Sequence, residues 1–257
     1  MPAGWADALR RVERWLLPPA CLHCDEPLAT ARADEPLVCD VCRARWRPLP
    51  TPHCRRCGEP SMLGLACRVC PGWPAGLDGV RSAVELDPQT RRVVHRLKYE
   101  GWPRLAAVMA VPMAGVVGEL AAGADLVPIP VSRARRRRRG YNQAEALAHA
   151  LGAVLGRPVR PDRLARPREA GSQVRLGRAA RQANLASAFA AAPSARPALL
   201  VDDVFTTGAT LVSAAAALLD AGADRVAAVT FARARPPLAE AADRLGTLIH
   251  PSTHETL

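Results

Sequence analysis

The chain has 257 residues, of which 49% are hydrophobic, a share that supports a folded core and argues against general disorder. Its 35 basic residues exceed its 24 acidic ones and give a formal net charge of +11, so phosphorylated ligands or nucleic acid are the expected partners. All apolar runs fall short of the roughly 18 residues that a membrane-spanning helix requires, and charges interrupt the N-terminal stretch, so we expect no membrane span, no secretory signal and a cytoplasmic protein.

Residues 1–19 predict an N-terminal amphipathic helix. The apolar side chains Trp5, Leu9, Val12 and Leu16 are spaced four, three and four residues apart, as on one face of a helix. Two consecutive prolines, Pro18 and Pro19, end this predicted helix, which covers residues 5–17.

All eight cysteines lie between residues 21 and 70, in four Cys-x-x-Cys pairs. The pairs are Cys21/Cys24, Cys39/Cys42, Cys54/Cys57 and Cys67/Cys70. A gap of two residues lets both thiolates of a pair reach one zinc ion at about 2.3 Å, and two pairs complete a tetrahedral site. Such a site has no open coordination position, so the spacing predicts two structural zinc ions in a double zinc ribbon over residues 20–72. This segment lacks an apolar core of its own, so metal binding must supply its folding free energy.

Two other uses of the cysteines are compatible with the same spacing. Four disulfide bonds would suit a secreted protein, although no secretory signal is present. An iron–sulfur cluster takes the same thiolate ligands. The sequence also leaves open which pairs share an ion, because consecutive pairs and interleaved pairs both satisfy the count.

Beyond a Gly- and Pro-containing linker over residues 72–79, the pattern changes to alternating strands and helices. Strands are predicted over residues 80–86, 126–130, 198–201 and 225–231. Helices are predicted over residues 88–99, 103–121 (kinked or split at Pro112), 142–155, 176–190 and 210–221. This order predicts an α/β domain over residues 80–235, with a parallel sheet covered on both faces, and a C-terminal tail over residues 236–257.

The sharpest motif runs from Ala198 to Thr210, where an apolar strand ends in two adjacent acids, Asp202 and Asp203. A Thr- and Gly-rich turn follows, and then a helix begins. Open parallel sheets bind ligands at the carboxyl ends of their strands, where this turn lies. The turn amides, the helix N-terminus and the threonine hydroxyls suit a dianionic phosphate. The acids would repel that phosphate, so they must face neutral hydroxyls or a hydrated cation, which predicts a sugar phosphate as the ligand.

This stretch closely resembles the phosphoribosyl-pyrophosphate motif of type I phosphoribosyltransferases. The resemblance implies that Asp202 and Asp203 contact the ribose 2- and 3-hydroxyls. It also implies that the 5-phosphate is bound by the turn formed by Thr206, Thr207, Gly208, Ala209 and Thr210. The alternative is an ordinary strand–turn–helix connection with a solvated acid pair, and the compatible offsets of the acids, the glycine and the three threonines argue against it.

Further segments extend the resemblance along the chain. They are His95–Gly101, Val127–Pro130, Arg139–Gln143, Gln173, Leu176, Arg181, Asn184 and Ala188–Phe189. With the cysteine-rich N-terminal part, their order is similar to that of the ComF competence-protein family over residues 20–232. The sequence departs from the family pattern at Ala170, where the family usually has Thr, so a hydroxyl contact is lost there.

The resemblance to the ComF family implies a cytoplasmic protein that assists DNA uptake in natural transformation, with single-stranded DNA and DNA-uptake proteins as partners. It implies a site for phosphoribosyl pyrophosphate with Mg²⁺, in which Val127–Pro130 corresponds to the pyrophosphate loop and Arg139, Asn142 and Gln143 lie beside it. An active phosphoribosyltransferase would displace pyrophosphate at the anomeric carbon in favour of a base or amine acceptor. Nothing in the residues indicates an acceptor, so a binding protein and an enzyme both stay open.

Two basic features of the sequence have two interpretations each. The run formed by Arg133 and Arg135–Arg139 is either a solvated surface loop or a group at the ligand-binding edge of the sheet that grips pyrophosphate or a nucleic-acid backbone. Lys98 is the single lysine among the 35 basic residues. It is either a plain surface residue or a ligand-binding residue at a position that needs a compact ammonium group.

Overall fold

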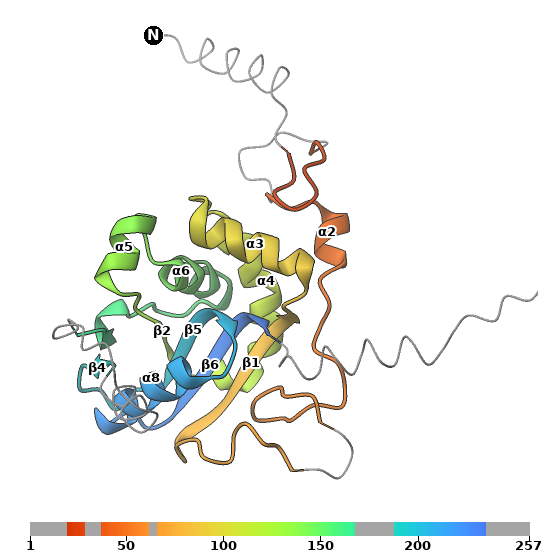
Figure 1. The fold of residues 1–257 in the computed structure, drawn as a ribbon. Coiled ribbons are helices and arrows are strands. Elements are labelled where there is room, and N and C mark those ends of the chain that lie inside the picture. The colour runs from red at the N-terminus through yellow and green to blue at the C-terminus, as the bar shows by residue number, and fades with distance from the viewer. Residues whose placement is uncertain (1–19, 29–36, 62–65, 168–187, 235–257) are drawn as a thin grey trace, which may run out of the picture.

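A four-stranded parallel sheet forms the centre of the molecule (Figure 1). The computed structural model describes residues 20–28, 37–61, 66–167 and 188–234. The strands lie in the order β1-β6-β5-β2, where β1 is Leu77–Glu85, β2 is Asp125–Pro128, β5 is Ala198–Phe205 and β6 is Val226–Arg233. All three neighbouring pairs are parallel, which confirms the predicted α/β fold.

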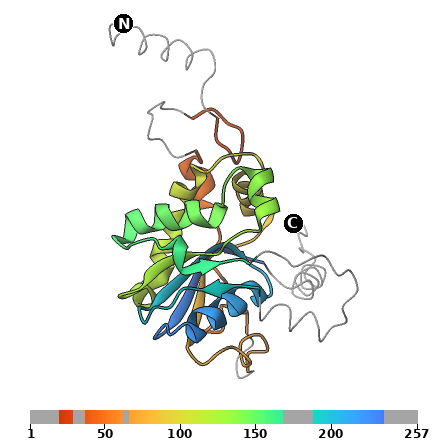
Figure 2. The same cartoon turned by 90° about the vertical axis from the view of Figure 1, so that its left-hand side faces the viewer.

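Helices cover both faces of this sheet (Figure 2). One face carries α3 (Pro88–Tyr99), α4 (Leu105–Val117) and α6 (Gln143–Leu155), and the other face carries α8 (Ala209–Asp220). Met109 and Leu151 are fully buried on the first face, and Leu218 is fully buried on the second. The strand β6 lies inside the sheet and is covered on both faces, so every one of its residues is buried, and all of them except Thr230 and Arg233 are apolar.

The helix boundaries follow signals that the sequence carries. The Asp87 carboxylate caps α3 by accepting hydrogen bonds from the amides of Gln89 and Thr90 at 3.0 and 2.7 Å. The Asn142 side chain caps α6 by accepting from the Ala144 amide at 3.0 Å. Glu145, in the first turn of this helix, forms an ion pair with Arg136 at 3.5 Å.

The long helix expected over residues 103–121 differs in detail. The α-helical part, α4, continues through Pro112 without a split and ends at Val117, and a short 3₁₀ helix, η1 (Gly118–Ala121), follows. Proline removes one amide donor from a helix. Met109 and Met113 on either side of it are fully buried in the core, and this packing holds the helix together across the missing hydrogen bond.

The helix expected over residues 176–190 is wrong at its C-terminal end. Ala190–Ala191 form a short strand, β4, which pairs antiparallel with β3 (Leu164–Ala165) after a 3₁₀ turn, η2 (Pro161–Arg163). Alanine favours helix, but the pairing and the burial of Phe189 outweigh that preference. The rest of that prediction, residues 176–187, lies outside the described residues, as do the helix predicted over 5–17 and the tail over 236–257.

The cysteine-rich segment packs along the free side of β1, the edge strand (Figure 1). A short helix, α2 (Asp40–Ala44), lies in this segment. The amides of Val80 and Glu85 donate to the carbonyl oxygens of Arg56 and Arg47, both at 2.8 Å, and so the segment covers the edge of the sheet. The predicted linker over residues 72–79 is shorter than expected, because β1 already begins at Leu77.

The arginine run is a helix rather than a loop. The helix α5 (Arg133–Arg139) begins at Ser132, whose hydroxyl accepts from the Arg135 amide at 3.3 Å, and ends at Gly140 in the left-handed conformation. Within the described part of the chain, no helix is both long and apolar enough to cross a membrane.

Candidate functional site

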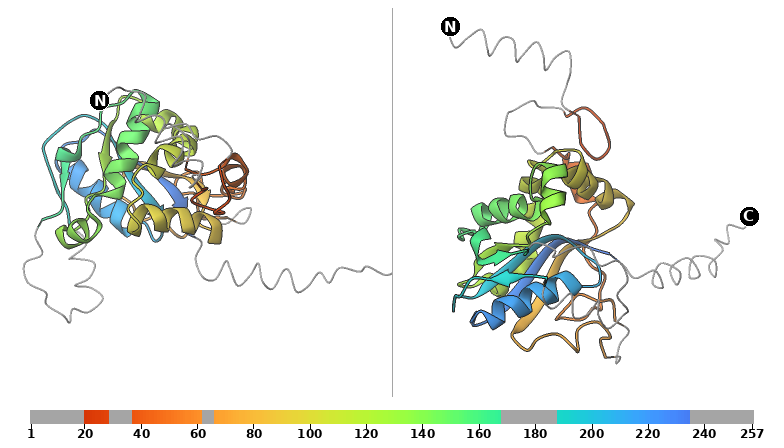
Figure 3. Two further views of the ribbon diagram at one scale, coloured as in Figure 1. Left: turned by 90° about the horizontal axis from the view of Figure 1, so that it is seen from above. Right: turned by 60° about the vertical axis from the view of Figure 1, so that its left-hand side comes forward.

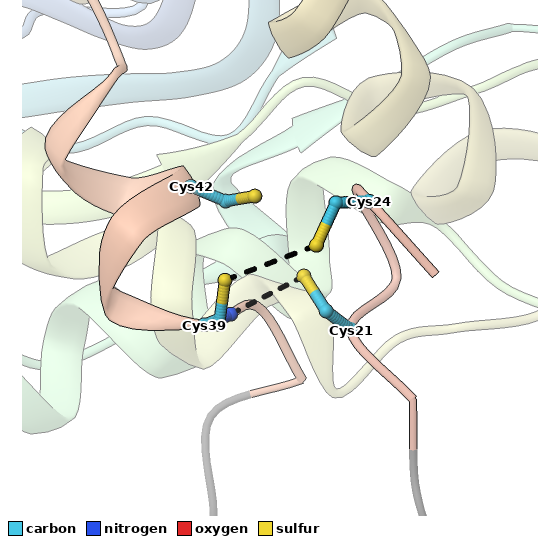
Figure 4. Close-up of side chains that lie close together, drawn as sticks. All are labelled: Cys21, Cys24, Cys39 and Cys42. Carbon is cyan, nitrogen blue, oxygen red and sulfur yellow. Dashed lines mark hydrogen bonds between the residues drawn. The ribbon is translucent and has the colours of Figure 1, made fainter. Parts of the chain in front are cut away.

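The first four cysteines converge on one point, which we call the first cysteine centre (Figure 4). The sulfur atoms of Cys21, Cys24, Cys39 and Cys42 all lie within 4.8 Å of one another. One pair lies on a turn and the other at the start of α2. The Cys39 amide donates to the Cys21 sulfur at 3.3 Å, and the sulfur atoms of Cys24 and Cys39 are 4.0 Å apart.

The last four cysteines, Cys54, Cys57, Cys67 and Cys70, form the second cysteine centre by the same geometry. The sulfur atoms of Cys54 and Cys70 are 3.7 Å apart, and those of Cys57 and Cys67 are 3.5 Å apart. The Val69 amide donates to the Cys67 sulfur at 3.4 Å. Consecutive pairs therefore share a centre, and the interleaved arrangement is excluded.

Both centres fit a zinc ion. A tetrahedral site with Zn–S bonds of about 2.3 Å has sulfur–sulfur edges of about 3.8 Å, and the separations of 3.5, 3.7 and 4.0 Å in the two centres lie around that value. They are far from a disulfide bond of about 2.05 Å. Four thiolates leave no open position, so the two zinc sites are structural.

The pKa values of the thiols differ within each centre. Burial opposes ionisation of Cys21, but amide hydrogen bonds, above all that from Cys39, lower its pKa to about 7. The pKa of Cys67 is also lowered to about 7 against the effect of burial, by the amides of Cys70 and Val69. Burial raises the pKa of Cys57, so zinc uptake must displace a proton there.

A cleft of about 520 Å³ lies at the carboxyl ends of β2 and β5 and is lined by residues of α3, α6 and the start of α8. Figure 3 shows the sheet between the helices of the first face and α8. The cleft brings together predicted site residues that are distant in sequence. Those that line it are Lys98, Gln143, Asp202, Asp203, Thr206 and Thr210.

The two acids at the end of β5 have different surroundings. Asp203 is buried, and its Oδ1 atom forms an ion pair with the Lys98 ammonium at 2.7 Å. Its Oδ2 atom is also buried and has no hydrogen-bond partner among the described residues. Asp202 is half-buried and accepts the Asp203 amide at 2.8 Å. Burial, and then the charge of Asp203, raise the pKa of Asp202 to about 7.

The turn after β5 connects the acid pair to the start of α8. Within it, the Ala209 amide donates to the Thr207 hydroxyl over a long distance of 3.4 Å. Gly208 has a φ of +80° and a Cβ there would lie 2.9 Å from the Phe205 ring, so this position requires glycine for two reasons. The helix α8 begins at Ala209, which leaves the first amides of the helix directed away from its own carbonyls.

The three residues expected beside the pyrophosphate loop have distinct positions. Gln143 lines the cleft and accepts a hydrogen bond from the Arg139 guanidinium. Arg139 does not line the cleft itself but stacks on the Tyr99 ring, 5.1 Å from its centroid. Asn142 is buried, and its amide donates to the Ile129 carbonyl oxygen at 3.0 Å. It therefore orients the segment after β2 and caps α6 rather than facing the cleft.

Four further lining residues with polar side chains were not predicted as site residues: Arg91, His95, Tyr99 and Arg166. Arg135 also lines the cleft, as one of the two interpretations of the arginine run expects. The sequence could have indicated Arg91 and His95 as site residues. They are spaced four and three residues apart from one another and from the predicted Lys98, so all three share one face of α3. Arg166 had no such signal. It reaches the cleft because β3 pairs with β4, and its guanidinium lies 5.6 Å from the Phe189 ring centroid. Ala170 lies outside the described residues.

Known proteins are similar to the cysteine-rich segment and to most of the chain as a whole. Residues 12–71 match the family model described as a double zinc ribbon domain. The DNA utilization protein YhgH of Salmonella typhimurium is 31% identical over 219 residues, which cover 82% of this chain and 95% of that protein. Competence protein ComFC of Bacillus subtilis is 27% identical, with 79% and 89% of the two chains covered. Competence protein F of Haemophilus influenzae is 28% identical, with 83% and 96% covered.

A similarity that covers 82% of this chain extends well beyond the residues of the zinc-ribbon match. The order of segments in the sequence, the two four-cysteine centres and the parallel sheet agree with the same assignment. The chain belongs to the ComF competence-protein family.

Proposed function

We propose that the protein binds phosphoribosyl pyrophosphate, or a closely similar sugar phosphate, together with Mg²⁺ in the cleft at the carboxyl ends of the strands. The observation that carries this proposal is the meeting of an acid pair, a lysine and an open Thr/Gly turn in one cleft. These groups match the two ends of a sugar phosphate, since hydroxyls need acceptors and phosphates need donors.

Each group then has a role. The Oδ2 atom of Asp203 is a buried acceptor to which no described residue donates, and a ribose hydroxyl would satisfy it. Asp202 would accept the neighbouring hydroxyl. The turn amides and the hydroxyls of Thr206 and Thr210 would hold the 5-phosphate at the start of α8. Lys98 lies close enough to neutralise the acid pair or the pyrophosphate, whose remaining charge Mg²⁺ would compensate.

We infer that this site serves DNA uptake in a cytoplasmic protein. Relatives are named for competence and for DNA utilization, which supports a role in that process. The surface beside the cleft supports contact with single-stranded DNA, because the arginines of α5 from Arg133 to Arg138 are exposed and Arg135 also lines the cleft. Arginine side chains bind phosphate oxygens in pairs of hydrogen bonds. DNA-uptake proteins are the further partners that we propose.

An active phosphoribosyltransferase is the second candidate, favoured by the pKa of about 7 of Asp202. A group with this pKa accepts a proton efficiently near neutral pH. In such a reaction a bond from the acceptor nitrogen to the anomeric carbon forms while the bond to pyrophosphate breaks. Pyrophosphate leaves with the electron pair, and Asp202 would take the proton from the nitrogen.

Titration calorimetry with phosphoribosyl pyrophosphate tests the ligand proposal. We expect binding that requires Mg²⁺ and disappears in the double variant Asp202→Asn, Asp203→Asn. The control is Asp220→Asn, at the exposed far end of α8, which should bind as the wild type does. Absence of heat with the wild-type protein, at millimolar ligand and with Mg²⁺ present, would overturn the proposal.

The cellular role and the enzymatic candidate need separate measurements. Deletion of the gene should reduce transformation, and the wild-type gene should restore it better than the double Asn variant does. Undiminished transformation after deletion would contradict the role in DNA uptake. Release of pyrophosphate from labelled ligand in the presence of base or amine acceptors would support the transferase, and binding without release would leave a ligand-binding protein.

A further inference from the structure

We propose that the second cysteine centre holds the turn Thr206–Thr210 in place through Arg233, so that the affinity for the sugar phosphate depends on that centre. This inference rests on the proposed sugar-phosphate site. The first cysteine centre has no comparable contact with the turn among the described residues. Arg233 is a positioning residue here, since it does not line the cleft.

Arg233 ties the centre to the sheet. It is the last residue of β6, and its side chain is only 3% exposed. One guanidinium nitrogen donates to the Cys57 carbonyl oxygen at 2.5 Å, and the other forms an ion pair with Glu59. Both partners lie on the turn that carries the second ligand of the centre. An ion bound at Cys57 therefore fixes the position of the guanidinium.

The same guanidinium supports the residue before the phosphate-binding turn. Its central carbon lies 4.2 Å from the centroid of the Phe205 ring. The two residues are also paired across β5 and β6, and the Ala234 amide donates to the Phe205 carbonyl oxygen at 2.8 Å. Gly208 lies so close to this ring that a Cβ would approach it to 2.9 Å. A shift of the Phe205 ring must therefore move the turn.

A second contact reaches Phe205 from the other pair of ligands. Trp73 follows Cys70 by three residues, and its ring centroid lies 6.1 Å from that of Phe205. Arg56 fixes this tryptophan by placing its guanidinium 5.7 Å from the ring centroid and by donating to the Cys70 carbonyl oxygen at 3.1 Å. The Phe205 ring therefore contacts two residues, Arg233 and Trp73, each of which is hydrogen-bonded to the backbone of a cysteine of the second centre.

The first centre packs elsewhere. Its residues Cys21 and Cys42 belong to the apolar cluster of α3, α4 and α6, whereas Phe205 and α8 belong to the cluster on the opposite face. Among the described residues, the contacts that link a cysteine centre to the turn therefore start from the second centre and not from the first.

Hydrogen exchange of the full-length, zinc-loaded protein tests the coupling without any ligand. In Arg233→Met we expect the amides of residues 205–212 to exchange about tenfold faster, because the turn loses its support. The matched control is Arg163→Met. Arg163 is equally buried, pairs with Asp125 at 3.1 Å and donates to the Arg196 carbonyl oxygen at 2.9 Å, but it lies at the amino ends of the strands. This control should leave the exchange of the turn unchanged.

Calorimetry on the same proteins gives the second readout. We expect affinity for phosphoribosyl pyrophosphate with Mg²⁺ to fall about tenfold in Arg233→Met, with two zinc ions retained, and to stay unchanged in Arg163→Met. If Arg233→Met fails to fold, the milder variant Glu59→Gln decides, since it removes the charge of the partner but keeps a hydrogen-bond acceptor. Loss of metal is an independent test. Cys67→Ser should accelerate amide hydrogen exchange of the turn, and Cys24→Ser in the first centre should not.

The two proposals fail in different ways. Equal exchange rates of the turn in the wild type, Arg233→Met and Cys67→Ser would overturn the coupling, whatever the ligand does. Faster exchange without any binding by the wild type would support the coupling and overturn the sugar-phosphate site. Normal binding by a zinc-loaded Arg233→Met protein would overturn the effect on affinity while the site itself stands.

Discussion

Asp202 should make the stability of the fold depend on pH. Its pKa is about 7 in the folded protein, above the ordinary value of 3.8, because burial and the charge of Asp203 disfavour its ionised form. Folding then takes up a proton, so stability falls as the pH rises from about 4 to about 7 and levels off above that. Asp202→Asn removes this penalty. We expect its melting temperature to exceed that of the wild type at pH 8 and to match it near pH 4, by about 2–4 °C for each kcal/mol recovered.

Thermal denaturation at a series of pH values measures this difference. Asp220→Asn serves as the control, because Asp220 is exposed at the far end of α8. A melting-temperature difference between Asp202→Asn and the wild type that is the same at pH 4 and pH 8 would disprove the assignment of the shifted pKa to Asp202.

Gly208 should tolerate no side chain. Alanine there must adopt a φ of +80° and also push against the Phe205 ring, 2.9 Å from the new Cβ. We expect Gly208→Ala to lose about 1–3 kcal/mol of stability and to bind the sugar phosphate more weakly. Gly222→Ala is the matched control, since Gly222 has a φ of +94° but nothing within 4 Å of a Cβ. Chemical denaturation of both variants separates the cost of the positive φ from the cost of the contact with Phe205. Equal losses of stability in the two variants would mean that the Phe205 contact is unimportant.

Single residues differ in how much the sequence reveals about them. The acid pair and the turn were predictable because they are contiguous, so that one local pattern carries strand, acids and helix start. The ion pair between Lys98 and Asp203 was not, because it depends on where α3 packs against the sheet. Asn142 belonged to a segment that resembled a ligand site, yet its amide is used by the Ile129 carbonyl oxygen inside the fold.

At the scale of elements, apolar periodicity predicted most of the sheet and its helices. The helices predicted over residues 88–99, 142–155 and 210–221 agree with α3, α6 and α8 to within one residue at each end. The predictions failed where tertiary contacts outweigh the secondary-structure preferences of a few residues. Ala190–Ala191 form a strand because β3 lies beside them, and the helix α4 passes Pro112 because its neighbours are buried. Neither contact is visible in a local window of sequence.

The helix α5 should govern the salt dependence of DNA binding. The variant Arg133→Gln, Arg137→Gln, Arg138→Gln removes three exposed charges from it. For single strands each lost phosphate contact should reduce the slope of log affinity against log salt by about 0.7. Fluorescence titration with an oligonucleotide at several salt concentrations measures this slope. The control is Arg45→Gln, Arg55→Gln, Arg92→Gln, which removes the same charge elsewhere on the exposed surface, and an equal effect of both triples would reject a specific role of α5.

At the scale of the whole molecule, the cysteine-rich segment and the sheet share one core. The segment was expected to lack an apolar core of its own, and in the structure its apolar side chains pack into the core of the sheet domain instead. Trp46 packs edge-on against Phe231 of β6, with ring centroids 4.9 Å apart, and Val38 lies in the same cluster as the helices α3 and α4. The sequence of an edge strand does not show what covers it, so this packing could not be predicted from the cysteine spacing.

Removal of zinc should therefore destabilise the sheet as well as the cysteine centres. Without metal the centres lose the ions that fix them, and β1 loses the cover on its edge while Trp46 leaves the shared core. We expect a single calorimetric transition whose midpoint falls by about 10 °C or more after chelation, since each kcal/mol corresponds to about 2–4 °C in a chain of this size. Tryptophan fluorescence and far-UV circular dichroism should report the same midpoint. Readdition of zinc is the control and should restore the original transition. Two separate transitions, with the sheet melting at its original temperature, would mean that the two parts fold independently despite their packing.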